Sequence, residues 1–280
     1  MSSLASDLSI RSTVELNNGV HMPVLGLGVY QSPPGRITRN AVCSALGAGY
    51  RHFDTARIYG NESDVAQAIR DSGISREEIF ITTKLWNADQ GFDTTLRACE
   101  ASIRRMGVDH LDLYLIHFPV SQVRNESWKA MKTLLMNGKC RAVGVSNFTI
   151  RHLDELLEKT DQVPAVNQVE FHPFLYQKKL LEYCRGKKIQ VEAYSPLARA
   201  EKLEHPTLGS IAAKYSKSPA QLMIRWSLQH GLVVIPKSVR EERIRENSRV
   251  FDFNISEEDM HVIDSLDESL RTNWDPTNVP

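Results

Sequence analysis

Several side chains that can bind or react stand where short apolar runs of the sequence end. Asp54, Lys84 and His117 each follow or close a stretch rich in β-branched or aromatic residues. A phenol, Tyr59, stands five residues after Asp54. A carboxylate, an ammonium, an imidazole and a phenol that meet at one site can push each other's pKa values apart, which is what acid–base catalysis requires. The sequence therefore predicts an acid–base site, provided that the fold brings these run ends together.

Further polar groups end the later runs in the same way. They are Ser146 with Asn147, Gln168, Tyr194, and Lys237 with Ser238. Each residue singly has a simpler interpretation, because loop ends are commonly polar. Asp54 could cap a turn, and Tyr59 could be a half-buried loop aromatic. Lys84 could solvate a strand end, and His117 could be a core histidine.

The elements that must position these groups alternate along the chain. Eight short apolar runs predict strands, and segments of helical period separate them. The predicted strands are Leu25–Val29, Arg51–Asp54, Ile79–Leu85, Leu111–His117, Ala142–Ser146, Ala165–Glu170, Ile189–Tyr194 and Leu232–Pro236. Eight repeated strand–helix units favour one (β/α)8 TIM-barrel domain over residues 1–280, whose active site would lie at the carboxyl ends of the strands. A doubly wound open sheet is the alternative fold.

Local patterns predict the other elements. Five apolar residues share one face of a helix: Phe92, Leu96, Cys99, Ile103 and Met106. Ser218 and Gln221 form a capping box around Pro219, which marks a helix start. Residues 14–22 hold an Asn-Asn-Gly turn and predict an N-terminal β-hairpin that plugs one end of the barrel. The long interval after Leu197 leaves room for an extra loop and helix, and an irregular tail, 271–280, ends the chain.

Composition narrows the class of function. The 280 residues carry 34 basic and 34 acidic side chains, a balance that argues against nucleic acid or an anionic membrane surface as the main partner. No apolar run approaches the ~20 residues of a membrane helix, and residues 1–11 carry no signal-peptide pattern. The four cysteines lack metal-type spacing and predict reduced, mostly buried thiols. We expect a cytoplasmic protein with a small-molecule partner.

The segment RHFDTARIYGNE, residues 51–62, resembles the signature of the aldo-keto reductases. The resemblance covers nearly the whole chain, through TTKLW (82–86), DLYLIHFP (112–119), VGVSNF (143–148), VNQVEFHP (166–173), AYSPL (193–197) and VVIPKSVREERIRENSRVFDF (233–253). It implies a monomeric NADPH-dependent carbonyl reductase that converts aldehydes and ketones to alcohols. Asp54, Tyr59, Lys84 and His117 would occupy the catalytic tetrad positions.

The chemistry implied for the tetrad is consistent with these residue types. A phenol of pKa about 10 is a poor proton donor near neutral pH and needs help from its surroundings. Lys84 would lower the pKa of Tyr59, the general acid, and Asp54 would hold Lys84 in place. His117 would orient the carbonyl group and offset the developing oxyanion charge. The cofactor would supply the hydride.

The resemblance also implies a cofactor site without a Rossmann fingerprint, which is absent because Gly26 and Gly28 have no third glycine partner. Ser146, Asn147 and Gln168 would bind the nicotinamide carboxamide, and Tyr194 would stack on the ring. The remaining implied cofactor contacts are Ser195 and Leu197 beside Tyr194, Lys237, Ser238 and Arg243 at the 2′-phosphate, and Glu246 and Asn247 near the adenine. Two cations at one point suit a phosphate and therefore favour NADPH over NADH.

The predicted substrate pocket consists of Tyr30, Trp86, His117 and Phe118, with Phe118 at a position where the family commonly has Trp. Trp274 could close over the barrel mouth or anchor the tail to its flank. Two other functions remain open: a structural or interaction protein on the same fold, and a metal-dependent hydrolase that uses His52, Asp54 and His117. The hydrolase lacks an H-x-H pair and a late acidic ligand, so no metal site is expected.

Overall fold

The computed structural model describes residues 8–280 and contains eight parallel strands, each followed by helical structure. The strands of the main sheet are β3 (Leu27–Gly28), β4 (His52–Asp54), β5 (Phe80–Leu85), β6 (Leu111–Ile116), β7 (Cys140–Ser146), β8 (Val166–Glu170), β9 (Gln190–Tyr194) and β10 (Val233–Val234). They pair in sequence order, so that each strand lies beside the next one along the chain. This order results from eight strand–helix repeats wound in one direction.

The sheet closes on itself. Parallel bridges join Leu25 to Val234 and Gly28 to Lys237, between the first and last strand segments. The Gly26 amide donates to the Val234 carbonyl at 2.9 Å, and the Val234 amide donates to Val24 at 2.9 Å. The predicted (β/α)8 barrel is therefore confirmed, and the open sheet is wrong. β3 and β10 are shorter than predicted because the first and last strand segments are joined by isolated bridges and not by a continuous ladder of hydrogen bonds.

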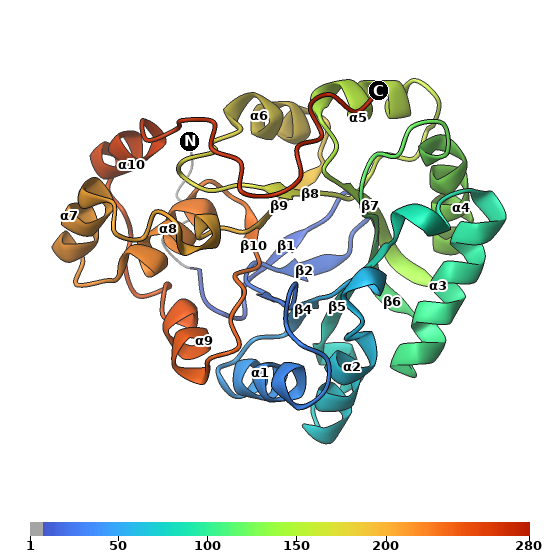
Figure 1. Ribbon diagram of the computed structural model, residues 1–280, viewed down its shortest axis with the longest axis horizontal. Coiled ribbons are helices and arrows are strands. Elements are labelled where there is room, and N and C mark those ends of the chain that lie inside the picture. The colour runs from blue at the N-terminus through green and yellow to red at the C-terminus, as the bar shows by residue number, and fades with distance from the viewer. Residues whose placement is uncertain (1–7) are drawn as a thin grey trace.

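Helices form a ring outside the strands (Figure 1). They are α1 (Arg36–Gly47), α2 (Glu62–Asp71), α3 (Phe92–Met106), α4 (Arg124–Met136), α5 (Ile150–Leu157), α6 (Lys178–Gly186), α7 (Pro206–Lys214), α8 (Pro219–Gln229), α9 (Glu241–Ser248) and α10 (Glu257–Asp264). The extra helix predicted after Leu197 is α7. The capping box of α8 is also confirmed, since the Gln221 amide donates to Ser218 Oγ and the Ser218 amide donates to Gln221 Oε1.

The buried face of α3 differs from the predicted one. Cys99 and Met106 are buried as expected, but Phe92 is 39% exposed. The other buried residues of the helix are Thr95 and Ser102. Because these side chains are short, the helix can pack closely against the barrel through them, and Phe92 is left at the exposed edge. The predicted face was therefore wrong at Phe92, since the spacing of apolar residues does not show which small polar residues are buried.

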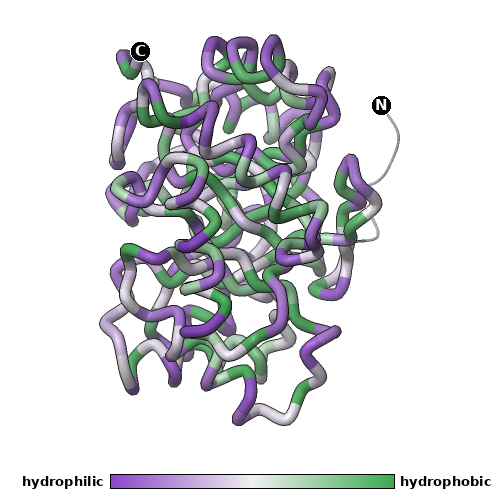
Figure 2. Tube along the Cα trace, turned by 90° about the vertical axis from the view of Figure 1, so that its right-hand side faces the viewer, coloured by the Kyte–Doolittle hydropathy of each residue, from purple (hydrophilic) through white to green (hydrophobic). Residues whose placement is uncertain are grey.

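The predicted hairpin consists of β1 (Thr13–Glu15) and β2 (His21–Pro23), paired antiparallel. Leu16 and Met22 from this hairpin are buried against core residues at one end of the barrel, namely Phe80, Leu113, Leu115, Ala142, Ala165, Val166 and Val233. The hairpin therefore plugs that end, as expected. In the side view of Figure 2 apolar stretches run through the interior of the molecule.

Two expectations from composition concern the whole chain. All four cysteines lie in the described residues and are free, and Cys43 alone among them is exposed. Within residues 8–280 no helix has the length and apolar character needed to cross a membrane. Residues 1–7, the start of the segment in which no signal peptide was predicted, lie outside the described residues.

Candidate active site

Asp54 and Lys84 form a buried ion pair inside the carboxyl end of the barrel. Asp54 ends β4, and its register partner on β5 is Thr82, whose side chain shares a face with that of Lys84 two residues on. Lys84 Nζ donates to Asp54 Oδ1 at 2.6 Å and Oδ2 at 2.7 Å, and to the Thr55 carbonyl at 2.9 Å. The three bonds use all three ammonium hydrogens, so the ammonium is fixed in position.

Tyr59 covers this pair from the loop after β4. Lys84 Nζ lies 5.1 Å from the centroid of the Tyr59 ring. The loop is held by buried Asn61, whose Oδ1 accepts from Thr55 Oγ1 at 2.7 Å and whose Nδ2 donates to the Val29 carbonyl at 3.1 Å. These bonds tie the loop to β3 and β4 and bring the phenol over the ammonium.

His117 completes the group that the sequence predicted. It follows β6, its amide donates to the Leu85 carbonyl at 3.2 Å, and its ring centroid lies 5.7 Å from that of Tyr59. The side chain is buried, and its Nδ1 has no hydrogen-bond partner within the described part of the chain. A buried ring nitrogen without a partner suits a site that receives a polar ligand. The structure thus brings Asp54, Tyr59, Lys84 and His117 together.

The electrostatics of the cluster correct one expectation. Lys84 was expected to lower the pKa of Tyr59, but burial and the negative charge of Asp54 raise this pKa well above 10. The physical reason is that Lys84 directs its hydrogens to Asp54 and the Thr55 carbonyl and not to the phenol, so that its charge does not outweigh burial and the charge of Asp54. Burial, together with the charge of Lys84, lowers the pKa of His117 well below 6.5. The site thus presents a protonated phenol and a neutral imidazole at neutral pH.

A second polar group lies beside the tetrad at the ends of β7, β8 and β9. Ser146 Oγ donates to the Gln168 carbonyl at 2.9 Å. Tyr194 OH donates to Asn147 Oδ1 at 2.7 Å, and Asn147 Nδ2 donates to the His117 carbonyl at 3.0 Å. Asn147 has φ 64°, which Asn tolerates better than most residues. These bonds fix the amide groups relative to the imidazole.

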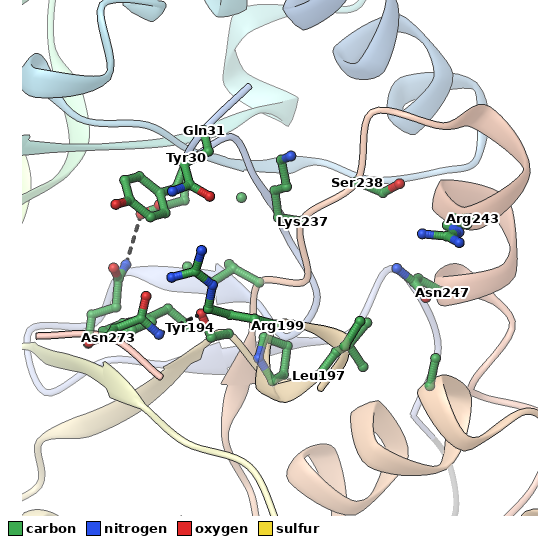
Figure 3. Close-up of a pocket in the computed structure, with 18 of the residues that line it drawn as sticks. Tyr30, Gln31, Tyr194, Leu197, Arg199, Lys237, Ser238, Arg243, Asn247 and Asn273 are labelled. Carbon is green, nitrogen blue, oxygen red and sulfur yellow. Dashed lines mark hydrogen bonds between the residues drawn. The ribbon is translucent and has the colours of Figure 1, made fainter. Parts of the chain in front are cut away.

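One cavity of about 560 Å³ connects the tetrad with the loop between β10 and α9 (Figure 3). All eleven residues predicted to contact the cofactor line it, together with Asp54, Tyr59, His117 and Tyr30: Ser146, Asn147, Gln168, Tyr194, Ser195, Leu197, Lys237, Ser238, Arg243, Glu246 and Asn247. Figure 3 shows Tyr194 and Asn273 at one end of the cavity and Arg243 with Asn247 at the other. An elongated ligand could therefore contact both groups at once.

Two cations line the cavity: Lys237, which Figure 3 shows beside Gln31, and Arg243, which it shows at the end remote from Tyr194. Lys237 and Arg243 are exposed to the cavity and make no ion pair with an acidic residue among residues 8–280. Arg245, on the same helix, instead pairs with Glu241 at 2.9 Å and does not line the cavity. Cations that line a cavity without a carboxylate partner can bind an anion such as a phosphate group.

Trp86 and Phe118, predicted in the substrate pocket, do not line this cavity. They contact its rim through Trp274, whose ring centroid lies 5.9 Å from Trp86 and 6.1 Å from Phe118. The same ring lies 5.9 Å from His117. Of the two interpretations of Trp274, these ring contacts support the one in which it lies over the barrel mouth. In Figure 1 the tail that carries it passes in front of β8 and β9.

Sequence reasoning missed the residues that fix this tail. Glu170, the last residue of β8, accepts hydrogen bonds from the amide of Thr272 at 2.8 Å and from its Oγ1 at 2.5 Å, and from the Asn273 amide at 3.2 Å. Arg199, which also lines the cavity, donates to the Thr272 carbonyl at 3.2 Å. The position of Glu170 at a strand end could have marked it as a residue of the barrel mouth. No local sequence pattern marked Arg199 or Asn273 in this way.

The residues of the metal-hydrolase alternative do not form a ligand set. Lys84 occupies both carboxylate oxygens of Asp54, and His52 lies deeper in the barrel, where its Nε2 is 3.1 Å from Thr82 Oγ1. Among residues 8–280 no group of three or more His, Cys, Asp or Glu side chains could bind a metal ion.

The fold and the site together are those of a (β/α)8-barrel enzyme with its active site at the carboxyl ends of the strands. A sequence model of the Aldo/keto reductase family matches residues 25–268, and the chain belongs to that family. It is therefore an oxidoreductase of a family that reduces carbonyl compounds.

Similar proteins match over nearly their whole length. Glyoxal reductase of Bacillus subtilis is 50% identical over 271 residues, which are 97% of this chain and 98% of that protein. An aldo-keto reductase from a Medee basin deep-sea metagenome library superposes with a TM-score of 0.92 at 45% identity, over 96% and 99% of the two chains. A Bombyx mori aldo-keto reductase in complex with NADP superposes with a TM-score of 0.88 at 34% identity, over 94% of this chain and 95% of that chain.

Proposed function

We propose that this protein reduces aldehydes and ketones to alcohols with NADPH and uses Tyr59 as the general acid. One observation carries the proposal: the buried Lys84–Asp54 pair lies under Tyr59 in a cavity that also reaches Lys237 and Arg243, two cations without a carboxylate partner among residues 8–280. The similarity to a glyoxal reductase and to a reductase in complex with NADP supports it.

The bound cofactor supplies the hydride for the carbonyl carbon, and the chain's own residues manage the proton. As the carbon accepts the hydride, the π electrons of the C=O bond move to oxygen, and Tyr59 OH donates its proton to that oxygen. An alkoxide is a stronger base than a phenolate, so this transfer is favourable although the pKa of Tyr59 is raised. The tyrosinate left behind regains a proton from water, which the open cavity admits.

His117 and Lys84 assist this transfer in different ways. A neutral His117 donates an N–H hydrogen bond to the carbonyl oxygen and orients it toward Tyr59. Lys84, 5.1 Å from the Tyr59 ring centroid, stabilises the phenolate that forms after transfer. Asp54 keeps the ammonium in place and compensates its charge while the phenol is protonated.

The cavity residues fit NADPH in an extended orientation. Ser146, Asn147 and Gln168 would bind the carboxamide, and Tyr194 would stack on the nicotinamide ring. At the other end, Lys237 and Arg243 would bind the 2′-phosphate that distinguishes NADPH from NADH. Ser238 and Asn247 lie toward Arg243 in Figure 3, and together with Glu246, which also lines the cavity, they would contact the adenosine part. Ser195, which accepts a hydrogen bond from Asn273 Nδ2 at 3.1 Å, and Leu197 would complete the cofactor contacts.

The substrate would enter beside the aromatic residues at the rim. Tyr30 lies with its ring centroid 5.0 Å from that of Tyr59, and Trp86 and Phe118 meet Trp274 above His117. Such walls favour small carbonyl compounds with an apolar or flat part. We further propose that the chain acts as a monomeric, single-domain protein of the cytoplasm, in keeping with its free cysteines; size-exclusion chromatography with light scattering tests the monomer.

The experiment that tests the function is oxidation of NADPH and of NADH by the wild-type protein with glyoxal and a panel of other aldehydes, ketones and diketones. We expect turnover with a clear preference for NADPH. If the protein binds NADPH tightly but oxidises it with no carbonyl compound of the panel, the proposal is wrong and a structural role of the fold gains support.

A further inference from the structure

One buried carboxyl group has no role in the proposed reaction. Glu192 lies in β9 within the barrel, and its side chain is fully inaccessible to solvent. It is the register partner of Gln168 on β8, so that both side chains point into the barrel from adjacent strands. A carboxyl group in such surroundings is costly unless a hydrogen bond compensates it, and its contacts therefore indicate its role.

Those contacts converge on the amide of Gln168. Gln168 Nε2 donates to Glu192 Oε2 at 2.8 Å and to Asp54 Oδ2 at 2.8 Å. An amide NH2 group has two hydrogens, and the two carboxyl groups accept both of them. The amide plane is thereby fixed, and its oxygen points away from the two carboxyl groups, on the side of the cavity that Gln168 lines.

The surroundings of Glu192 allow this bond without a second buried negative charge. Burial and the charge of Asp54 raise the pKa of Glu192 to about 8, so the group is mostly protonated at neutral pH and still accepts at Oε2. His52 Nε2 lies 3.5 Å from Glu192 Oε1, and burial followed by the charge of Lys84 lowers the pKa of His52 to about 3. The facing imidazole is therefore neutral and does not draw the carboxyl group into an ion pair.

We propose that Glu192 is a positioning residue for the cofactor: its Oε2 fixes the Gln168 amide so that the amide oxygen accepts a hydrogen bond from the carboxamide NH2 group of the nicotinamide. The inference rests on the proposed function, because it assigns Gln168 to that carboxamide. Asp54 alone would hold one hydrogen of the amide and leave its plane free to turn. With the second bond in place, the oxygen is aimed before the cofactor arrives, which reduces the entropy lost on binding.

The test pairs variants of the protein with a variant of the ligand. In the 3-acetylpyridine analogue of NADP+ a methyl group replaces the carboxamide NH2, so the analogue cannot donate to Gln168. Dissociation constants of both ligands are measured by quenching of tryptophan fluorescence. We expect wild-type protein to prefer NADP+ roughly threefold to tenfold, the effect of one hydrogen bond. Glu192→Met, which lacks the acceptor, should lose this preference, and Glu192→Gln, which keeps one, should retain it.

The control and the contradicting outcomes separate this inference from the proposed function. Glu62→Gln alters another buried carboxyl group, bonded to Thr83 and Arg105, and should leave the preference unchanged. If Glu192→Met does not fold, Glu192→Thr replaces it, since Thr suits a strand and is too short to reach Gln168. If the variant without the acceptor still prefers NADP+ over the analogue, the role of Glu192 is wrong but the proposed function stands. Wild-type protein that binds neither ligand overturns the proposed function.

Discussion

Replacement of Lys84 by Met should destabilise the protein strongly, because it leaves Asp54 buried without its counter-ion. The ammonium makes three hydrogen bonds of 2.6 to 2.9 Å, and the Lys84 and Asp54 side chains are 1% and 3% exposed. Removal of one partner of such a pair costs about 3–5 kcal/mol. For a chain of this size the loss corresponds to a fall in the melting temperature on the order of 10 °C.

The assay is urea unfolding of the wild-type protein and two variants, followed by circular dichroism. Lys84→Met should show the full loss, whereas Lys84→Met combined with Asp54→Asn should recover most of it, because no unpaired charge remains. Neither variant should reduce carbonyl compounds at the wild-type rate.

The pH dependence of the single variant provides a further check. Without the ammonium, the pKa of Asp54 in the folded state rises further above its unfolded value, so the folded state binds a proton more readily. The stability deficit of Lys84→Met should therefore narrow as the pH falls. A single variant within 1 kcal/mol of wild type, or a double variant no more stable than the single one, would refute the idea of a coupled buried pair.

Two other predictions concern the ends of the cavity. Arg243→Ala should weaken NADPH binding by about one to two orders of magnitude, the contribution of hydrogen bonds to a charged group, and should leave NADH binding almost unchanged; titration calorimetry measures both, with Arg245→Ala as the control. Glu170→Gln should loosen the tail that carries Trp274. Burial alone would raise the pKa of Glu170, but hydrogen bonds from His172 and Thr272 lower it to about 2. The stability that Glu170 contributes is thus complete above the unfolded pKa of about 4.5 and is lost as the pH falls toward 2. Urea unfolding from pH 7 to pH 2 should show the difference between wild type and Glu170→Gln shrink over that window.

Each of these two predictions has an outcome that contradicts it. Equal losses of NADPH and NADH affinity in Arg243→Ala would show that the guanidinium does not recognise the 2′-phosphate. A stability difference for Glu170→Gln that is constant with pH would show that the carboxylate charge does not hold the tail.

The barrel and most of the site could be predicted from sequence because their signals are local. A strand end is a change from apolar to polar residues, and in a barrel all such ends meet at one mouth. Their positions therefore marked Asp54, Lys84 and His117 as candidates, and the resemblance to the aldo-keto reductases supplied the roles predicted for them. The hairpin was equally clear, since Asn17, Asn18 and Gly19 form a turn signal between alternating residues.

The predictions that were wrong and the residues that were missed depend on contacts between segments far apart in the sequence. The sequence does not show that Lys84 donates its hydrogen bonds to Asp54 and the Thr55 carbonyl. The pKa of Tyr59 was expected to fall because this arrangement depends on the fold. The buried face of α3 was predicted incorrectly because small polar residues, and not only apolar ones, can face a closely packed barrel. Glu192 sits in mid-strand, where a polar residue gives no indication of its partner until the neighbouring strand is placed beside it.

In the proposed reaction Tyr59 delivers the proton to the carbonyl oxygen while the cofactor delivers the hydride. The most direct test is the single-turnover rate of NADPH oxidation by glyoxal in wild-type and Tyr59→Phe protein, with NADPH affinity measured in parallel. We predict a fall in rate of about 10²- to 10⁴-fold, the usual contribution of a general acid, with affinity nearly unchanged. A Tyr59→Phe protein that reduces glyoxal at the wild-type rate would show that Tyr59 is not the proton donor.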